Sequence, residues 1–163
     1  MSRLRVALLD GDGGGYSAEL EAALRAAGHD PRLITGGAVA PVEALLSRRG
    51  FTRGLSRVPG VTLELLRGGF DAAHAFSAPD AAAARAWRRV TGRPAVFTCD
   101  ETVDRETLAD ARLRLELVTR AIEDSDATTA ASDEVLAAME RWLACSPPVL
   151  RASDAAAHER LYA

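Results

Sequence analysis

The sequence predicts an α/β protein whose three-layer, Rossmann-like doubly wound parallel sheet spans residues 1–163 as one domain. Three observations lead to this prediction. Short apolar runs alternate with stretches of roughly 10–20 residues that have helical periodicity. The apolar runs are continuous, which is typical of parallel strands buried on both faces. The length suits a single domain, and no linker or internal repeat divides the chain.

The first strand is predicted over residues 3–9, an apolar run that ends at Asp10 and a cluster of glycines. Ser17 is predicted to cap the following helix, because apolar residues then recur every three or four positions until Gly28 stops the helix. A second short strand is predicted at residues 31–35. This segment therefore has the order strand, helix, strand.

No strand is predicted between residues 41 and 68, where the sequence favours two helices. The first would end near Gly50, and the second would begin after Pro59. The apolar residues of these two helices are Val42, Leu45, Leu46, Val61, Leu65 and Leu66.

The next strand is predicted at residues 72–76, followed by Ser77 and, three positions on, Asp80 in the spacing of a capping box. The alanine-rich stretch 78–90 is predicted to be a helix, with a strand at 94–99 after it. The residues that this helix should bury are Ala86, Trp87 and Val90.

The longest helix is predicted over residues 105–124, and a strand over 127–131 follows it. Ser132 should cap a helix that runs through Leu143, and residues 147–152 should add a last short strand. The apolar stripes of the two helices are Leu108, Ala111, Leu115, Val118 and Ile122, then Val135, Met139 and Trp142.

The composition excludes several mechanisms, because all 20 basic residues are arginine and the chain has no lysine. A phosphate-binding P-loop, pyridoxal-phosphate chemistry and the common protein-kinase mechanism each need a lysine. The two cysteines and three scattered histidines have no metal-ligand spacing, so no metal site is expected. The net charge of −3 argues against nucleic-acid binding. No signal peptide or membrane span is evident, which predicts a cytoplasmic protein.

Ligands of such sheets bind outside the carboxyl ends of the strands, which directs attention to the loop at residues 11–16. Its glycines would let the backbone approach a ligand, and the helix N-terminus beyond would favour an anion. A tight turn without a ligand is the alternative. The loop is not a nicotinamide fingerprint, because Tyr16 takes the third glycine position and no acid closes the second strand. Asp10 and Asp12 resemble the acidic pair of a receiver domain, which would also need a lysine.

Two later strands also end in reactive side chains. His74 and Cys99 could form a base and a nucleophile, but a polar lining role for His74 is favoured over covalent catalysis. Asp100 and Glu101 follow the strand at 94–99, and Asp100 is the candidate catalytic carboxylate. Either acid could bind a sugar hydroxyl, act as a base or be a solvated loop residue.

A basic segment at residues 47–57 carries four arginines around Phe51 and Leu55. It could meet an anionic membrane surface or a phosphorylated acceptor, or it could be a solvated face. The chain would then contact the inner membrane face peripherally at most. The four residues are Arg48, Arg49, Arg53 and Arg57.

The succession of these segments resembles the N-terminal domain of family 4-like glycosyltransferases, which is one half of a GT-B architecture. The motifs that carry the resemblance are RVALLDGDGGGYSAELEAALRAAGHDPRLIT, FDAAHAFSAPDA, GRPAVFTCDE, SDATTAASDEV and PPVL. The resemblance implies a half that binds a small-molecule or lipid-linked sugar acceptor. It implies acceptor or phosphate contacts at Gly13, Gly14, Gly15 and Tyr16, a cleft wall at His74 and Ser77, and Ser132 at the last helix N-terminus.

The sequence also departs from the family pattern. Phe76 and Asp100 stand where the family has histidines, and no Glu-x7-Glu pair occurs. The nucleotide-sugar donor is therefore expected in another half, with no cofactor bound by this one. Three hypotheses stay open. The first is an acceptor half, either excised from or paired with a donor half, and the second is a non-catalytic binding domain that could form a homodimer. An unrelated α/β enzyme that uses Cys99 is the third.

Overall fold

A computed structural model describes residues 2–11, 14–35, 50–102 and 112–162, and it contains a five-stranded parallel sheet. The strand order is β2-β1-β3-β4-β5, so the chain reverses its direction of winding between β1 and β3. This confirms the predicted α/β class. The strands are β1 (Arg5–Leu9), β2 (Asp30–Ile34), β3 (Ala72–Ala75), β4 (Ala95–Cys99) and β5 (Ala127–Ala130).

The strands form because their apolar residues are buried on both faces. Along β1, Ala7 and Leu9 join one core cluster, while Val6 and Leu8 join the other. Successive side chains of a strand point to opposite faces, so one continuous apolar run supplies both cores. All of β3 and β4 is buried in the same way.

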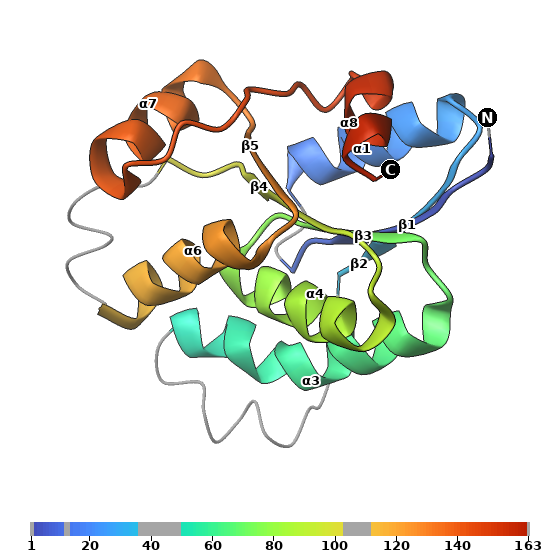
Figure 1. Cartoon of the computed structure of the whole chain (residues 1–163), viewed down its shortest axis with the longest axis horizontal. Coiled ribbons are helices and arrows are strands. Elements are labelled where there is room, and N and C mark those ends of the chain that lie inside the picture. Colours follow the sequence, from blue (N-terminus) through green and yellow to red (C-terminus); the bar gives the residue numbers. More distant parts are fainter. Residues whose placement is uncertain (1, 12–13, 36–49, 103–111, 163) are drawn as a thin grey trace.

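Helices cover both faces of the sheet (Figure 1), with α3, α4 and α6 on one face and α1 and α8 on the other. The inward residues of α7, Val135 and Met139, join the core cluster beneath α4. The helices are α1 (Gly15–Ala26), α3 (Gly50–Gly68), α4 (Ala78–Thr91), α6 (Arg112–Asp124), α7 (Asp133–Leu143) and α8 (Ala155–Leu161).

The start of α1 differs from the prediction. Gly14 is the N-cap residue, and Ser17 lies inside the first turn, where it is fully buried. The Ser17 hydroxyl bonds to Asp10 Oδ2 and to the Gly14 carbonyl instead of capping the helix. The predicted end is right, since Gly28 has φ = 91°, a conformation that favours glycine.

The helix predicted to begin after Pro59 begins earlier, because α3 starts at Gly50 and passes through that proline. Pro59 removes one backbone hydrogen bond. Val58 packs on the core before it, and Val61 and Leu65 are buried after it, so burial outweighs the lost bond. The helix predicted before Gly50 lies outside the described residues.

The helix phases were predicted correctly at Trp87, Val135 and Met139, which are buried, but not at the helix ends. Val90 is 71% exposed and Trp142 is 40% exposed, because both lie in the last turn of their helices, beyond the core residues. Leu115 is also exposed.

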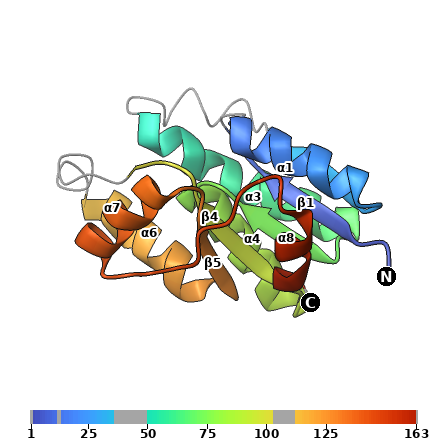
Figure 2. The same ribbon diagram turned by 90° about the horizontal axis from the view of Figure 1, so that it is seen from above.

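The chain after α7 was predicted to end in a strand, but only one bridge forms, between Val149 and Ala130. Figure 2 shows this segment running back across the sheet to α8, which lies beside α1. The helix α8 was not predicted. The segment from Ala152 to Tyr162, which contains α8, covers the second core with the buried side chains of Ala152, Ala157, His158 and Tyr162.

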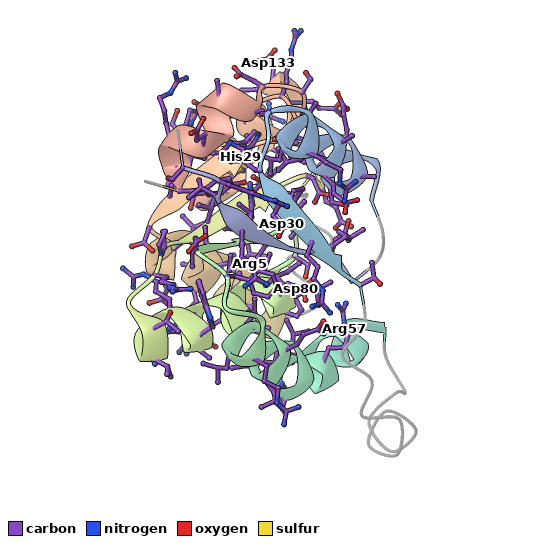
Figure 3. All side chains as sticks on the ribbon, turned by 90° about the vertical axis from the view of Figure 1, so that its right-hand side faces the viewer. Arg5, His29, Asp30, Arg57, Asp80 and Asp133 are labelled. Atoms are coloured by element: carbon purple, nitrogen blue, oxygen red, sulfur yellow. The ribbon has the colours of Figure 1, made fainter. Side chains whose placement is uncertain are left out.

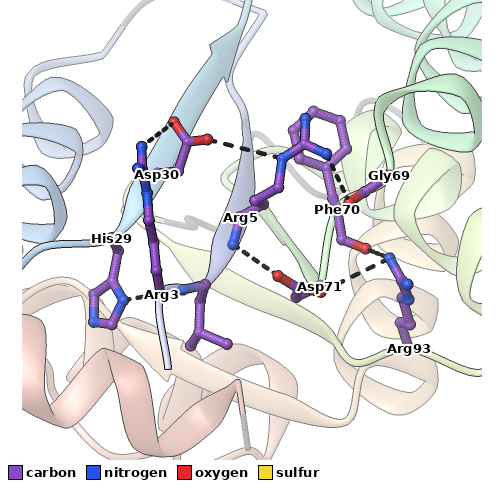
Figure 4. A network of polar contacts seen from close by, with 9 residues as sticks. Arg3, Arg5, His29, Asp30, Gly69, Phe70, Asp71 and Arg93 are labelled. Carbon is purple, nitrogen blue, oxygen red and sulfur yellow. Dashed lines mark hydrogen bonds and ion pairs between the residues drawn. The ribbon is translucent and has the colours of Figure 1, made fainter. Parts of the chain in front are cut away.

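Polar contacts hold the amino ends of the strands together (Figure 4). The Arg5 amide donates to Asp71 Oδ2 at 2.8 Å, and its guanidinium bonds to the Gly69 carbonyl. Asp30 pairs with Arg3 at 3.7 Å and with Arg5 at 3.8 Å. These partly exposed ion pairs are worth at most about 1 kcal/mol each. Because the charged groups of this edge contact one another and the strand backbones, we assign this edge a structural role.

The end of α7 offers a test of backbone strain. Ala144 has φ = 50°, which costs an alanine about 1 kcal/mol that glycine avoids. Ala144→Gly should therefore raise the melting temperature by about 2–4 °C, measured by thermal unfolding. Ala138→Gly, in the middle of α7, should lower it. A drop for Ala144→Gly would contradict the strain argument.

Candidate functional site

The glycine-rich loop reaches the carboxyl edge of the sheet directly after β1. The Gly14 amide donates to Asp10 Oδ2 at 2.6 Å, so the buried Asp10 carboxylate anchors the start of α1. Gly15 is exposed, and no atom lies within 4 Å of where its Cβ would be. Gly13 lies outside the described residues. At Gly15 the described part of the loop therefore presents bare backbone at this edge, and its contact with a ligand stays a prediction.

Asp100 meets this loop from the end of β4. Its Oδ2 lies 3.5 Å from where a Cβ on Gly14 would be, beside Asp10 Oδ2 at 3.3 Å. The negative charge of Asp100 contributes to raising the pKa of Tyr16 and of Cys99. The tertiary structure thus brings the predicted carboxylate and the predicted loop together. Glu101 is exposed, and its carbonyl accepts a hydrogen bond from Cys99 Sγ at 3.4 Å.

The Cys99 thiol does not fit a nucleophile. Burial, followed by the nearby charge of Asp100, raises its pKa to about 12, so it stays protonated at neutral pH. His74, its proposed base, has other partners. The covalent hypothesis therefore loses its support.

The prediction that His74 lines a cleft is wrong, because the ring is fully buried in the core. Nδ1 is hydrogen-bonded to the Tyr162 hydroxyl at 2.7 Å, and Nε2 to Thr98 Oγ1 at 2.6 Å. The ring stacks on Phe76 with centroids 4.6 Å apart. Thr98 in turn contacts Thr129 Oγ1 at 2.6 Å. His74 therefore joins β3 to β4, β5 and the C-terminal segment.

The Tyr16 hydroxyl contacts the C-terminal segment and not the edge where a ligand was predicted. Its hydroxyl donates to the Leu150 carbonyl at 2.8 Å and lies 3.2 Å from His158 Nε2. Burial is the main cause that raises its pKa. Tyr16 holds the segment before α8. Its hydroxyl is therefore used within the protein and does not face a phosphate or an acceptor as predicted.

The predicted basic patch is only partly described. Arg48 and Arg49 lie outside the described residues, as does the side chain of Arg53. Arg57 is described, and its side chain is 14% exposed and turned toward the sheet, where Nη2 lies 3.5 Å from Asp80 Oδ1. Figure 3 shows Arg57 and Asp80 close together. Arg57 is thus not a membrane-facing residue here.

The sequence analysis assigned Asp80 only to a capping box, but its side chain also contacts other residues at this edge. Its Oδ2 accepts hydrogen bonds from the Gly11 amide at 3.2 Å and from Ser77 Oγ at 2.8 Å. Burial raises its pKa, while Arg57 and these hydrogen bonds oppose the rise. The signal was present in the sequence: an acid in the first turn of a helix that follows a central strand.

Ser77 and Ser132 cap α4 and α7, as predicted. Ser77 Oγ accepts from the Asp80 amide and Ser132 Oγ from the Val135 amide, both at 3.2 Å. Both stand at the carboxyl edge, and their ligand contacts remain predictions. Within the described residues, no three His, Cys, Asp or Glu side chains gather as metal ligands, and no helix is long and apolar enough to cross a membrane.

A family model described as Glycosyltransferase Family 4 matches residues 14–150. The chain belongs to glycosyltransferase family 4. The matched range holds Gly14, Arg57, Asp80 and Asp100, while Asp10 and Gly11 lie before it. The helix α8 lies beyond it.

A solved structure shows the same fold. It is a sucrose-phosphate synthase from Thermosynechococcus elongatus, with a TM-score of 0.65, 17% identity, and 97% of each chain covered. This likeness supports the family 4 domain as the Rossmann-like half of a GT-B architecture. No curated protein matches the chain.

Proposed function

We propose that this family 4 domain is the acceptor side of a GT-B glycosyltransferase. It would hold a hydroxyl-bearing acceptor at the carboxyl edge of the sheet, while a separate half binds a nucleotide-sugar donor. The observation that supports this most is the approach of Asp100 to Gly14, with Oδ2 3.5 Å from where a Cβ would lie. A carboxylate beside bare backbone suits an acceptor that carries hydroxyl groups.

The roles follow from the chemistry of each group. The exposed backbone at Gly15 would lie against the acceptor, and α1 begins there without an acid in its first turn. Asp100 would accept a hydrogen bond from the acceptor hydroxyl and take its proton as the sugar is transferred. Holding acceptor and donor in one geometry would supply much of the rate. The chain by itself would bind the acceptor without transferring sugar.

Asp100→Asn tests the role of the carboxylate. With a family 4 donor half supplied in trans or by fusion, the variant should lower kcat about 100-fold, since a general base contributes about 10²–10⁴-fold. Sugar transfer to a panel of small and lipid-linked acceptors is the measurement. Glu123→Gln, an exposed acid near the end of α6, is the matched control and should stay within threefold. Full activity of Asp100→Asn would remove the role.

The same assay tests the proposal as a whole. Transfer that appears only when the donor half is present supports an acceptor domain. A properly folded fusion that is inert toward every acceptor favours the second candidate, a non-catalytic binding domain. The burial of His74 favours that candidate, because the family resemblance implied that this side chain would line the cleft and it does not.

Contact of the basic segment with a membrane is tested separately from sugar transfer. We propose that any peripheral contact with the inner membrane face involves Arg48, Arg49 and Arg53, because Arg57 is turned inward. Binding to vesicles with anionic lipids, compared with neutral ones, measures this contact. Equal binding to both would count against a lipid-linked acceptor held by the basic segment.

A further inference from the structure

A buried ion pair lies beneath the first turn of the glycine-rich loop, where the chain reverses its winding between β1 and β3. Arg57 comes from α3, Asp80 from the first turn of α4, and Gly11 from the loop after β1. Three segments distant in sequence therefore meet at one point. Asp80 is almost fully buried, and both of its carboxylate oxygens face these partners.

The guanidinium of Arg57 fills the space beside Gly11. A Cβ built on Gly11 would lie 1.3 Å from Arg57 Nη1 and 2.5 Å from Cζ. Non-bonded atoms cannot approach so closely, so the guanidinium would have to move. The backbone at Gly11 is not left-handed, unlike that of Gly28, Gly69 and Gly92. The need for glycine here thus comes from Arg57 and not from backbone conformation.

We propose that Arg57 and Asp80 are positioning residues that set the first turn of the acceptor loop. Asp80 holds the Gly11 amide, and Arg57 holds Asp80 while occupying the volume of a side chain at position 11. The loop then leads to Gly14, which lies against Asp10 and Asp100. The inference rests on the proposed function for its link to the acceptor, while its structural part stands separately.

The arrangement makes Gly11 and Arg57 depend on each other. An added methyl group at position 11 would move the flexible guanidinium away, so Gly11→Ala should break the ion pair as Arg57→Ala does. Once Arg57 is absent, the three atoms nearest to the methyl group are removed, because all three belong to the Arg57 guanidinium. The two substitutions should therefore be strongly non-additive.

The first experiment is a double-mutant cycle on the chain itself, followed by thermal unfolding. Gly11→Ala and Arg57→Ala should each lower the melting temperature by about 5 °C, and adding Gly11→Ala to Arg57→Ala should change it by less than about 2 °C. Gly15→Ala, at a position with open space, is the stability control. If Gly11→Ala does not fold, restoration of folding by Arg57→Ala supports the inference. Additive effects, or failure to restore, overturn it.

The pH dependence adds a reading that a packing effect would not give. Asp80 faces Arg57, Ser77, the Gly11 amide and the more distant charge of Asp10. Without Arg57, Asp80 favours its protonated form more. Lowering the pH should therefore reduce the destabilisation that Arg57→Ala causes. The gap in melting temperature between wild type and Arg57→Ala should halve between pH 7 and pH 4.5. A constant gap overturns the ion-pair role.

The second experiment separates this inference from the proposed function. In the fusion with a donor half, Arg57→Ala should raise KM for the acceptor at least tenfold and leave kcat within threefold. Arg141→Ala, on the exposed part of α7, is the control. An unchanged KM overturns the link to the acceptor. If the wild-type fusion transfers no sugar, the proposed function fails, while the cycle still decides the ion-pair role.

Discussion

Tyr162→Ala is expected to lower the free energy of unfolding by about 4 kcal/mol, the typical cost of truncating a buried aromatic residue. Tyr162 is 5% exposed and belongs to the core cluster formed with Val6, Leu8 and Val96. Its loss would leave a cavity over the sheet and remove the hydroxyl partner of His74. Such a loss is a large part of the 5–15 kcal/mol that stabilises a typical domain.

Tyr162→Phe is the matched control, because it keeps the ring and removes only the hydroxyl. It leaves His74 Nδ1 buried without its 2.7 Å partner, which should cost about 2 kcal/mol. Urea denaturation of the three proteins measures both differences. If Tyr162→Ala costs less than about 1 kcal/mol, the C-terminal segment does not contribute to the core as the structure indicates.

The second large effect is a loss of stability in mild acid, caused by two buried histidines 5.4 Å apart between ring centroids. Burial, together with the neighbouring His158, lowers the pKa of His74 well below its usual range. Burial also lowers the pKa of His158, against the opposing effects of the Arg151 carbonyl and Asp154. Tyr16 and Tyr162, the other titratable groups in contact, are neutral in this range.

The sign of the effect follows from proton uptake. Well above about pH 6.5 both rings are neutral in the folded and unfolded chain, and their titration costs no stability. Below it the unfolded chain takes up protons that the folded chain refuses, so the free energy of unfolding falls as pH falls. The slope should reach up to about 1.4 kcal/mol per pH unit for each histidine, down to its folded pKa.

Urea denaturation between pH 7.5 and 5.0 measures this slope. His158→Gln should reduce the slope by up to one proton's share, whatever its effect on stability at pH 7.5. Asp80 acts in the opposite sense, because burial raises its pKa. A slope that His158→Gln leaves unchanged would contradict the assignment.

Local patterns were enough to predict most of the sheet. The apolar runs at residues 3–9 and 94–99 formed β1 and β4, because a strand buried on both faces needs few distant details to be recognised. Ser77 and Ser132 were predicted as caps because a cap depends on bonds to residues three positions away. Local reasoning failed most clearly at Ser17, which was taken as a cap, and at α8, which contains three consecutive alanines and no long apolar stripe.

The candidate site was predicted in its location more than in its side chains. The glycine loop and Asp100 were expected at one edge because the carboxyl ends of parallel strands share it, and they lie together there. Arg57 was expected on a surface, yet its partner Asp80 draws it inward. No periodicity in residues 47–57 could indicate a partner on another helix.

The amino-acid sequence by itself determined the five strands of the parallel sheet and the edge where the glycines gather, because these depend on hydrophobic period and on neighbours a few residues apart. Only the tertiary structure decided where His74, Tyr16 and Arg57 point. His74 bonds to Tyr162, 88 residues away, and Tyr16 contacts His158, 142 residues away. A polar side chain near the core turns to whichever partner satisfies its hydrogen bonds, and that partner is known only once the chain has folded.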